Sequence, residues 1–403
     1  MIQIALLGFG VVGSGTADVL TENRALISSR LGEEISIKYI LDRRDFPEHP
    51  LGDRVVHDFD TILSDPEVRI VAEMMGGAHP AYDFTRAALE AGKSVVTSNK
   101  EVVATYGAEL LEIARVHGVF YLFEASVGGG IPIIRPLQDD LISNRILSVD
   151  GILNGTTNFI LTRMRECGAI FSDALAEAQK RGYAEADPTA DVEGLDAARK
   201  IVILAALSFG VLLSPASIPV TGISALTDDV TEVAESFGCT VRLIGHTERI
   251  GDRILALVSP HLVASGNPLC HVDGVYNGIL VDGNMLGRAF FYGAGAGKLP
   301  TASAVVADIL NAAKPGEPVR LPAWRVATDA DYAPAGERRV RRCFVLSGCE
   351  KCAEKTKPYF GYEGYLVRPG NFAFISRPMT DTEASAALRD CGKDLRWTLP
   401  VLD

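Results

Sequence analysis

The first fourteen residues contain the feature that most restricts the fold. An apolar run from Ile2 to Leu7 is followed by a G-x-G-x-x-G motif and then by a stretch with helical patterning. Strand, glycine motif and helix in this order are typical of a dinucleotide-binding Rossmann unit, because the glycines permit a tight turn and let the backbone approach a pyrophosphate. The residues predicted to bind the dinucleotide are Gly8, Phe9, Gly10, Val11, Val12 and Gly13.

The end of the second predicted strand bears on the choice of coenzyme. The run ISIKYIL ends at Asp42, and an acid in this place usually binds the ribose hydroxyls of NAD. Arg43 and Arg44 follow directly, and an arginine here can accept the 2′-phosphate of NADP. The sequence slightly favours NAD over NADP. The alternative for the two arginines is a solvated loop, since DRRDFPEHP is loop-like throughout.

Strands and helices alternate up to about residue 130. Strands are expected near 2–8, 35–41, 69–75, 94–98 and 119–125, with helices between them, for example over 80–91 and 101–117. Such alternation predicts a parallel, doubly wound sheet whose ligand lies at the carboxyl ends of the strands. Residues that follow strands are therefore candidates for binding the coenzyme: Gly76, Gly77, Ser98, Asn99 and Lys100. Lys100 is equally compatible with a surface lysine at a helix start.

The pattern changes near residue 143. We expect a Rossmann domain over 1–142, a second α+β domain over 143–300 that binds substrate and forms a dimer, and a small α+β region over 338–403. A glycine-rich loop that contains Gly297 leads into a helix expected over about 301–325, which returns to the Rossmann domain. Such a loop before a helix often holds an anion or a cofactor edge, although it can also pass under another element.

The acidic segment AQKRGYAEADPTADVEGLDAARK, Ala178 to Lys200, is the most informative part of the second region. Asp196 and Lys200 are four residues apart, so on a helix they share one face. Lys200 precedes the apolar run IVILAAL and so stands where the helix becomes buried. A lysine there needs carboxylate partners or has its pKa lowered by desolvation, and both states suit proton transfer. An ordinary surface ion pair is the alternative.

Composition excludes several classes of protein. The net charge of −12 over 403 residues, with no basic block, argues against nucleic-acid binding, and no apolar run reaches membrane-spanning length. The chain enters its first strand at once, which leaves no room for a signal peptide, so we expect a cytoplasmic protein. Seven cysteines do not suggest a disulfide framework. Four of them could in principle bind zinc, but the second C-x-x-C of a zinc ribbon is missing and reduced thiols are the favoured interpretation: Cys343, Cys349, Cys352 and Cys391.

Several separated blocks together resemble monofunctional homoserine dehydrogenases. These are segment 178–200, GILNGTTNFIL (151–161), TSNK (97–100), EASVGGGIPII (124–134) and GAGAGKLPTASAVVAD (293–308). The resemblance covers about residues 1–325. It implies the reversible, NAD(P)-dependent interconversion of L-homoserine and L-aspartate 4-semialdehyde in threonine, methionine and isoleucine biosynthesis. It also implies a homodimer or homotetramer.

The resemblance assigns roles to individual residues. Lys200 would transfer the proton at the substrate hydroxyl, with Lys100 as a second lysine beside it. Asp191 and Asp196 would hold the substrate end of the site, and Glu185 would bind the amino group. Gly155 and Thr156 would line the substrate and nicotinamide region. A monovalent cation, Na⁺ or K⁺, would be bound by Glu124 with the carbonyls of Val127, Gly129 and Ile131.

The C-terminal region departs from the family pattern. Many monofunctional members end in an ACT regulatory module with a D-x-PGVL-like turn after its first strand, and RRCFVLSGCEKCAEKT has no such turn. The later FAFISRPMTDTEASAALRD does resemble the closing strand and helix of that module. We therefore expect a shortened or divergent ACT-like region and weak or absent feedback by threonine.

Two other functions fit parts of the sequence. An aldehyde-oxidising, acyl-enzyme dehydrogenase needs a cysteine nucleophile beside a base, and no cysteine precedes Cys167. A non-catalytic NAD sensor with a thiol-rich tail is supported only by the C-x-x-C pair, and the two lysines with their acids argue against it.

Overall fold

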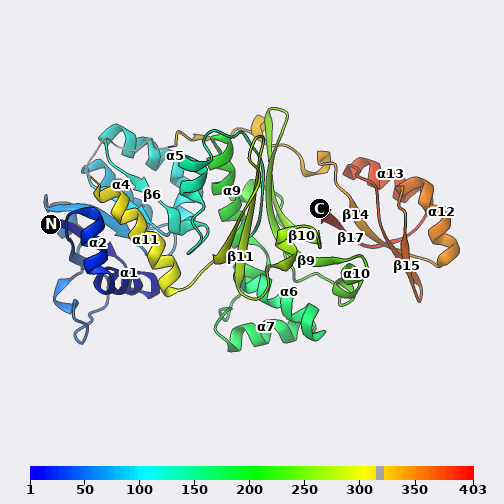
Figure 1. The fold of residues 1–403 in the computed structure, drawn as a ribbon, viewed down its shortest axis with the longest axis horizontal. Coiled ribbons are helices and arrows are strands. Elements are labelled where there is room, and N and C mark those ends of the chain that lie inside the picture. Colours follow the sequence, from blue (N-terminus) through cyan, green and yellow to red (C-terminus); the bar gives the residue numbers. More distant parts are fainter. Residues whose placement is uncertain (315–321) are drawn as a thin grey trace.

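The computed structural model describes residues 1–314 and 322–403. Three parts of the chain follow one another along the long axis of the molecule. The N-terminal α/β part lies at one end, a tall antiparallel sheet stands in the middle, and a smaller α+β part that contains the C-terminal strands and helices lies at the other end (Figure 1).

The N-terminal part is built on a parallel sheet. Its strands are β1 (Ile2–Leu7), β2 (Ile35–Leu41), β3 (Val55–Val56), β4 (Val68–Glu73), β5 (Ser94–Thr97) and β6 (Tyr121–Leu122). Within the described residues their order is β3-β2-β1-β4-β5-β6. The chain reverses its direction of winding between β1 and β4, and in open α/β sheets ligands bind outside the carboxyl ends of the strands at such a point.

Helices cover this parallel sheet. They are α1 (Val11–Glu22), α2 (Arg24–Leu31), α3 (Phe59–Leu63), α4 (Ala81–Glu90), α5 (Lys100–His117) and, from much later in the chain, α11 (Lys298–Ala313), which packs against α1. Helix α5 begins where it does because the Asn99 side chain accepts the backbone N–H groups of Glu101 and Val102. The glycine motif is closely packed: a Cβ on Gly13 would lie 2.1 Å from the Gly8 carbonyl oxygen.

The middle part is an antiparallel sheet with helices on it. Its long strands are β7 (Ile146–Ile152), β9 (Cys239–Ile250), β10 (Arg253–Ala264), β11 (Tyr276–Gly283) and β12 (Gly287–Ala294), while β8 (Val211–Leu212) pairs with β13 (Arg325–Val326). The helices are α6 (Gly155–Cys167), α7 (Phe171–Lys180), α8 (Thr189–Val192), α9 (Leu195–Phe209) and α10 (Val230–Ser236). Helix α9 buries its apolar run Ile201 to Ala206 and packs against β9 and β10.

The C-terminal part is a βαββαβ unit. Its elements are β14 (Arg342–Ser347), α12 (Glu350–Phe360), β15 (Tyr365–Arg368), β16 (Asn371–Ile375), α13 (Asp381–Cys391) and β17 (Leu395–Leu402), with strand order β17-β14-β16-β15. Strand β17 pairs in parallel with β10 through Leu262–Val401 and Val263–Leu402. The sheet of the middle part therefore continues into the C-terminal part.

The predicted fold class, a Rossmann domain followed by α+β parts, is confirmed. The helix expected over 301–325 begins earlier, at Lys298, and ends at Ala313; of the expected span, residues 315–321 lie outside the described residues. The earlier start is possible because Pro300 falls in the first helical turn, where no backbone N–H is needed. The domain boundaries stay predictions. In the described ranges, no helix is long and apolar enough to cross a membrane.

Candidate active site

One buried carboxylate holds two lysines together. Asp196 lies in the first turn of α9, and its Oδ2 is 2.8 Å from Lys200 Nζ, one turn later on the same helix. Its Oδ1 is 2.5 Å from Lys100 Nζ at the start of α5. Asp196 and Lys200 are buried, whereas the Lys100 side chain is 40% exposed. Because α5 belongs to the Rossmann part and α9 to the middle part, this cluster lies where the two parts meet (Figure 1).

Asn154 supports the cluster from the end of β7. Its Nδ2 donates to Asp196 Oδ2 at 3.0 Å and to Asp191 Oδ1 at 2.7 Å. Its Oδ1 accepts the Thr157 backbone N–H at 2.8 Å, so the same side chain caps helix α6. Asn154 therefore holds Asp191 and Asp196 next to each other and ties both carboxylates to the start of α6. We did not single it out from the sequence, although an asparagine just before Gly155-Thr156-Thr157 is a helix-capping signal.

The charged groups of the cluster shift one another's pKa values. Burial lowers the pKa of Lys200 and the nearby Lys100 adds to this, while Asp196 acts in the opposite direction. Burial alone would raise the pKa of Asp196, but Lys200 and Lys100 outweigh it and hold that pKa well below the usual range. Lys200 also donates a hydrogen bond to the Leu153 carbonyl oxygen at 2.6 Å. The result is an anchored lysine that releases its proton more readily than a lysine in water.

The other predicted substrate residues differ in their relation to this cluster. Asp191 belongs to it through Asn154. Thr156 is buried and donates to the Tyr183 carbonyl oxygen at 2.6 Å, and Gly155 begins α6. A Cβ on Gly155 would lie 2.7 Å from the Val275 carbonyl oxygen, which explains a glycine there. The Glu185 side chain is exposed, and its backbone oxygen accepts from Gln179 Nε2, so its role at the amino group stays a prediction.

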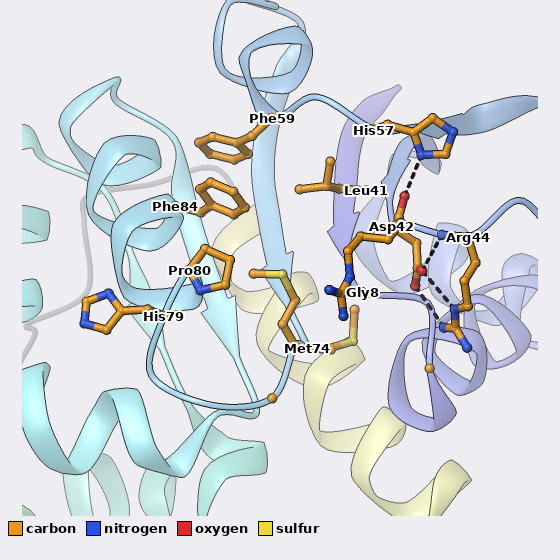
Figure 2. A pocket seen from close by; sticks show the side chains of 14 residues that line it. Gly8, Leu41, Asp42, Arg44, His57, Phe59, Met74, His79, Pro80 and Phe84 are labelled. Carbon is orange, nitrogen blue, oxygen red and sulfur yellow. Dashed lines mark hydrogen bonds and ion pairs between the residues drawn. The ribbon is translucent and has the colours of Figure 1, made fainter.

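A cavity of about 780 Å³ opens at the carboxyl ends of β1, β2 and β4. Five predicted coenzyme residues line it: Gly8, Gly10, Asp42, Arg43 and Gly76. The stacked rings of Phe59 and Phe84, with centroids 4.3 Å apart, form one wall (Figure 2). A dinucleotide that follows the glycine motif has room here, so the residues present fit a nicotinamide coenzyme.

Asp42 is held in place by its own neighbours. Its Oδ2 accepts the Phe9 backbone N–H at 2.8 Å, which ties the end of β2 to the glycine motif. The Arg44 guanidinium donates to both carboxylate oxygens at 3.0 Å, as Figure 2 shows. The bond from Arg44 is the main reason that the pKa of Asp42 lies well below its usual range. Asp42 is therefore a fixed anion, and part of its charge is offset by Arg44.

A second buried acid lies beside the loops after β4 and β5, which are predicted to bind the coenzyme. Glu73 ends β4, and its Oε2 accepts from Thr97 Oγ1 at 2.6 Å while its Oε1 accepts the Met75 backbone N–H at 2.7 Å. Burial raises the pKa of Glu73 to about 7. Asn99 continues the network, since its Nδ2 donates to the Gly77 carbonyl oxygen at 2.8 Å. The carboxyl ends of β4 and β5 are thus linked by side chains. Sequence reasoning missed Glu73 because it reads as part of an apolar strand.

The remaining predicted coenzyme residues lie at the same edge of the sheet or near the glycine motif. Ser98 follows β5, and its backbone N–H donates to the Glu73 carbonyl oxygen at 3.2 Å. Gly297 immediately precedes α11, whose first residue, Lys298, lies against α1: a Cβ on Gly15 would be 2.9 Å from Lys298 Cγ. Chain packing therefore brings the late glycine-rich loop back to the first Rossmann helix.

The predicted cation site lies in the loop after β6. Val127, Gly129 and Ile131 are buried there. The Glu124 carboxylate accepts the backbone N–H groups of Ile133, Ile134 and Arg135, at 2.7, 2.8 and 2.9 Å. The Glu124 carboxylate is therefore held in place by three of the chain's own amides. Carbonyl oxygens suit Na⁺ or K⁺, and the cation site stays a prediction.

Comparison with known proteins decides the family. Residues 8–124 match the family model of the homoserine dehydrogenase NAD-binding domain, and residues 132–310 match that of homoserine dehydrogenase itself. The homoserine dehydrogenase of Synechocystis is 45% identical over 318 residues, which are 77% of this chain and 73% of that protein. The chain belongs to the homoserine dehydrogenase family. The Neisseria gonorrhoeae enzyme is 44% identical over 315 residues, 78% of this chain and 72% of that protein.

Solved structures of homoserine dehydrogenases agree with this assignment. A homoserine dehydrogenase from Thiobacillus denitrificans superposes with a TM-score of 0.91 at 35% identity and covers 100% of this chain and 98% of its own. A hyperthermophilic archaeal homoserine dehydrogenase in complex with NADPH superposes with a TM-score of 0.66 at 29% identity, over 77% of this chain and 97% of its own. The predicted family, fold and activity as an NAD(P)-dependent oxidoreductase are thus confirmed.

Proposed function

We propose that Asp196, Lys200 and Lys100 handle the proton while L-homoserine is oxidised to L-aspartate 4-semialdehyde, and in the reverse reaction. The observation that carries this proposal is the pair of lysines on one buried carboxylate at the boundary between the coenzyme part and the middle part. When bound, the nicotinamide supplies the hydride chemistry. The chain's residues bind, orient and exchange the proton.

Lys200 is the residue proposed to take the hydroxyl proton. Two groups, Asp196 and the Leu153 carbonyl, orient its Nζ. Because burial lowers the pKa of Lys200, the neutral amine that a base requires is more accessible than for a lysine in water. In the reverse reaction the ammonium returns the proton to the aldehyde oxygen. Asp196 stays ionised throughout and stabilises the ammonium form.

The proposed roles of the neighbouring residues follow from charge. Lys100 is half-exposed and shares Asp196, so it places a second positive charge at the same boundary. Asp191, held by Asn154, and the exposed Glu185 are proposed to face the substrate ammonium, since a zwitterionic amino acid needs fixed anions near that group. Thr156 and Gly155 are proposed to line the region between substrate and nicotinamide.

For the coenzyme we propose NAD with slight preference over NADP. Asp42 is a fixed acceptor for ribose hydroxyls and would repel a 2′-phosphate, but Arg44 offsets part of its charge and Arg43 lines the same cavity. The variant Arg44→Ala should therefore strengthen the preference for NAD. Parallel measurement of kcat/KM with both coenzymes tests this, and an unchanged ratio would show that Arg44 does not act on the choice.

The monovalent cation, the oligomer and the biological setting are also proposals. Strand β12 is an edge of its sheet and exposes Phe290 and Tyr292, next to exposed Tyr276 on β11, which supports association with a second copy. A homodimer or homotetramer should therefore be seen by analytical ultracentrifugation. The cytoplasmic location and the role in threonine, methionine and isoleucine biosynthesis rest on the family resemblance alone.

The experiment that tests the proposed reaction follows the formation of reduced nicotinamide by its absorbance. Purified protein receives L-homoserine with NAD⁺ or NADP⁺, in buffers with Na⁺ or K⁺, and L-2-aminobutyrate, which lacks the hydroxyl group, serves as the control. We expect reduced coenzyme with homoserine only. If folded protein gives no reduced coenzyme under any of these conditions, the proposed reaction is wrong.

A further inference from the structure

Two cysteines lie side by side at the start of helix α12, far along the chain from the lysine cluster. Cys349 is the residue before the helix and is exposed, and Cys352 lies in its first turn and is half-buried. Their Sγ atoms are 3.6 Å apart. A disulfide needs about 2 Å between sulfurs, so a small movement of the two side chains would allow a bond. The C-x-x-C spacing and the helix start together place both thiols in one turn.

The surroundings favour a thiolate at this place. The pKa of Cys352 is lowered to about 7, first by a hydrogen bond with the Cys349 backbone and then by the side chains of Lys393 and Cys349. Lys393 follows helix α13, which packs against α12. A positive charge and a helix start are the features that make a cysteine reactive. The two sulfurs are therefore close together, and the lowered pKa of Cys352 favours the reactive thiolate.

Gly348 makes room for the second thiol. Its φ is +152°, and a Cβ there would lie 2.9 Å from Cys352 Cβ and 3.2 Å from its Sγ. A side chain at 348 would therefore collide with Cys352, so the glycine keeps free the space that Cys352 occupies.

The other cysteines of this region do not share these features. Cys343 is fully buried on β14, and burial raises its pKa well above the ordinary range. Cys391 donates to the Leu388 carbonyl oxygen, and burial raises its pKa. Among the residues that the structure describes, no three His, Cys, Asp or Glu side chains gather to hold a metal ion. The four cysteines weighed as zinc ligands thus separate into one close pair and two others.

We propose that Cys349 and Cys352 form a redox-active dithiol that becomes an intramolecular disulfide by exchange with a small-molecule disulfide such as oxidised glutathione. The Cys352 thiolate attacks one sulfur of the small disulfide, forms a mixed disulfide and releases one thiolate. Cys349 then loses its proton to water and attacks Cys352 Sγ, which forms the Cys349–Cys352 bond and releases the second thiolate. The two cysteines lose two electrons, and the small disulfide gains them as it becomes two thiols.

The first test is a redox titration of the full-length protein. Samples are equilibrated in a graded series from reduced to oxidised glutathione, quenched with acid, alkylated and analysed by peptide mass spectrometry. We expect the Cys349–Cys352 disulfide to appear within one copy of the chain as the buffer becomes oxidising, and Cys167→Ser, which removes an exposed cysteine elsewhere, to behave as wild type. Free thiols at both positions in the most oxidising buffer, or a disulfide between copies, would overturn the proposal.

The second test separates the two sulfurs. With oxidised glutathione, Cys349→Ser should retain glutathione on Cys352 because the resolving thiol is absent. At pH 7 the alkylation rate of Cys352 in that variant should exceed that of an unperturbed thiol by about tenfold. Lys393→Met should reduce this excess and Lys393→Arg should preserve it. Equal alkylation rates of Cys352 in Cys349→Ser and in its double variants with Lys393→Met and Lys393→Arg would show that Lys393 does not activate the thiol. A Cys352 rate no higher than that of an unperturbed thiol would overturn the proposed first attack by Cys352.

Discussion

Replacing Asp196 by asparagine tests the lysine cluster most severely. The amide has the shape of the carboxylate, but it removes the negative charge that lies 2.8 Å from Lys200 and 2.5 Å from Lys100. Removing one partner of a buried ion pair costs about 3–5 kcal/mol, since the other charge is left buried. Lys200 can limit this cost by releasing its proton, which for an ordinary lysine costs about 3 kcal/mol at pH 8. We therefore expect Asp196→Asn to lower the free energy of unfolding by about 3 kcal/mol at pH 8.

The same reasoning predicts how the stability of Asp196→Asn depends on pH. In the variant, the pKa of Lys200 in the folded protein falls further below its value in the unfolded chain. Between those two values the unfolded chain binds more protons than the folded protein, so the stability of the variant rises with pH. The deficit relative to wild type should shrink by up to about 1.4 kcal/mol for each pH unit above 8. Urea unfolding of both proteins at a series of pH values measures this.

Activity should fall together with stability. Without Asp196, the ammonium form of Lys200 is not stabilised and its Nζ loses an orienting partner, so kcat should fall by about 10²- to 10³-fold. The matched control is Asp187→Asn in the same acidic segment, because Asp187 is exposed and bonds only locally, to Thr189. That control should keep the wild-type kcat. An Asp196→Asn enzyme within about threefold of the wild-type kcat, with a deficit that does not change with pH, would refute the reasoning.

Three further predictions concern other parts of the molecule. Asn154→Ala removes the cap of α6 and the link between Asp191 and Asp196; it should cost about 1–2 kcal/mol of stability and reduce kcat/KM about tenfold, measured by urea unfolding and steady-state kinetics. Glu73 has a pKa of about 7 in the folded protein, above its unfolded value, so the folded protein binds the extra proton and stability falls as pH rises from about 4.5 to 7, by up to about 3 kcal/mol. Glu73→Gln should abolish this part of the pH profile in urea unfolding, and an unchanged profile would assign the effect to another group. Because the C-terminal part has no PGVL-like turn, millimolar L-threonine should leave the initial rate unchanged, and strong inhibition would contradict that expectation.

Local patterns predicted most of the Rossmann part. The strand and glycine motif at residues 2–13 and the helix from Lys100 are read from periodicity, glycines and caps, and the structure has them within a few residues. Strand β3 was missed because two residues carry no period. Helix α11 begins three residues before the expected start at 301, because a proline at position 300 fits the first turn of a helix.

The site was predictable only where its residues lie close in sequence. Asp196 and Lys200 are one helical turn apart, so their ion pair follows from spacing. Physical reasoning on the sequence does not bring Lys100 to Asp196, because that contact depends on how two domains pack, and only the family resemblance suggested it. The pairing of β10 with β17 joins strands more than 130 residues apart, and no local pattern encodes it.

The most direct measurement of the central claim compares wild type with Lys200→Met in one preparation of each. Turnover of L-homoserine and the Kd of the reduced coenzyme, by its fluorescence, are measured side by side. Lys200 lies in the cluster on α9 and is absent from the lining of the coenzyme cavity, so the account predicts a loss of turnover of about 10³-fold with a Kd within about twofold of wild type. A variant that keeps more than about a tenth of the wild-type turnover would contradict the assignment of proton transfer to Lys200.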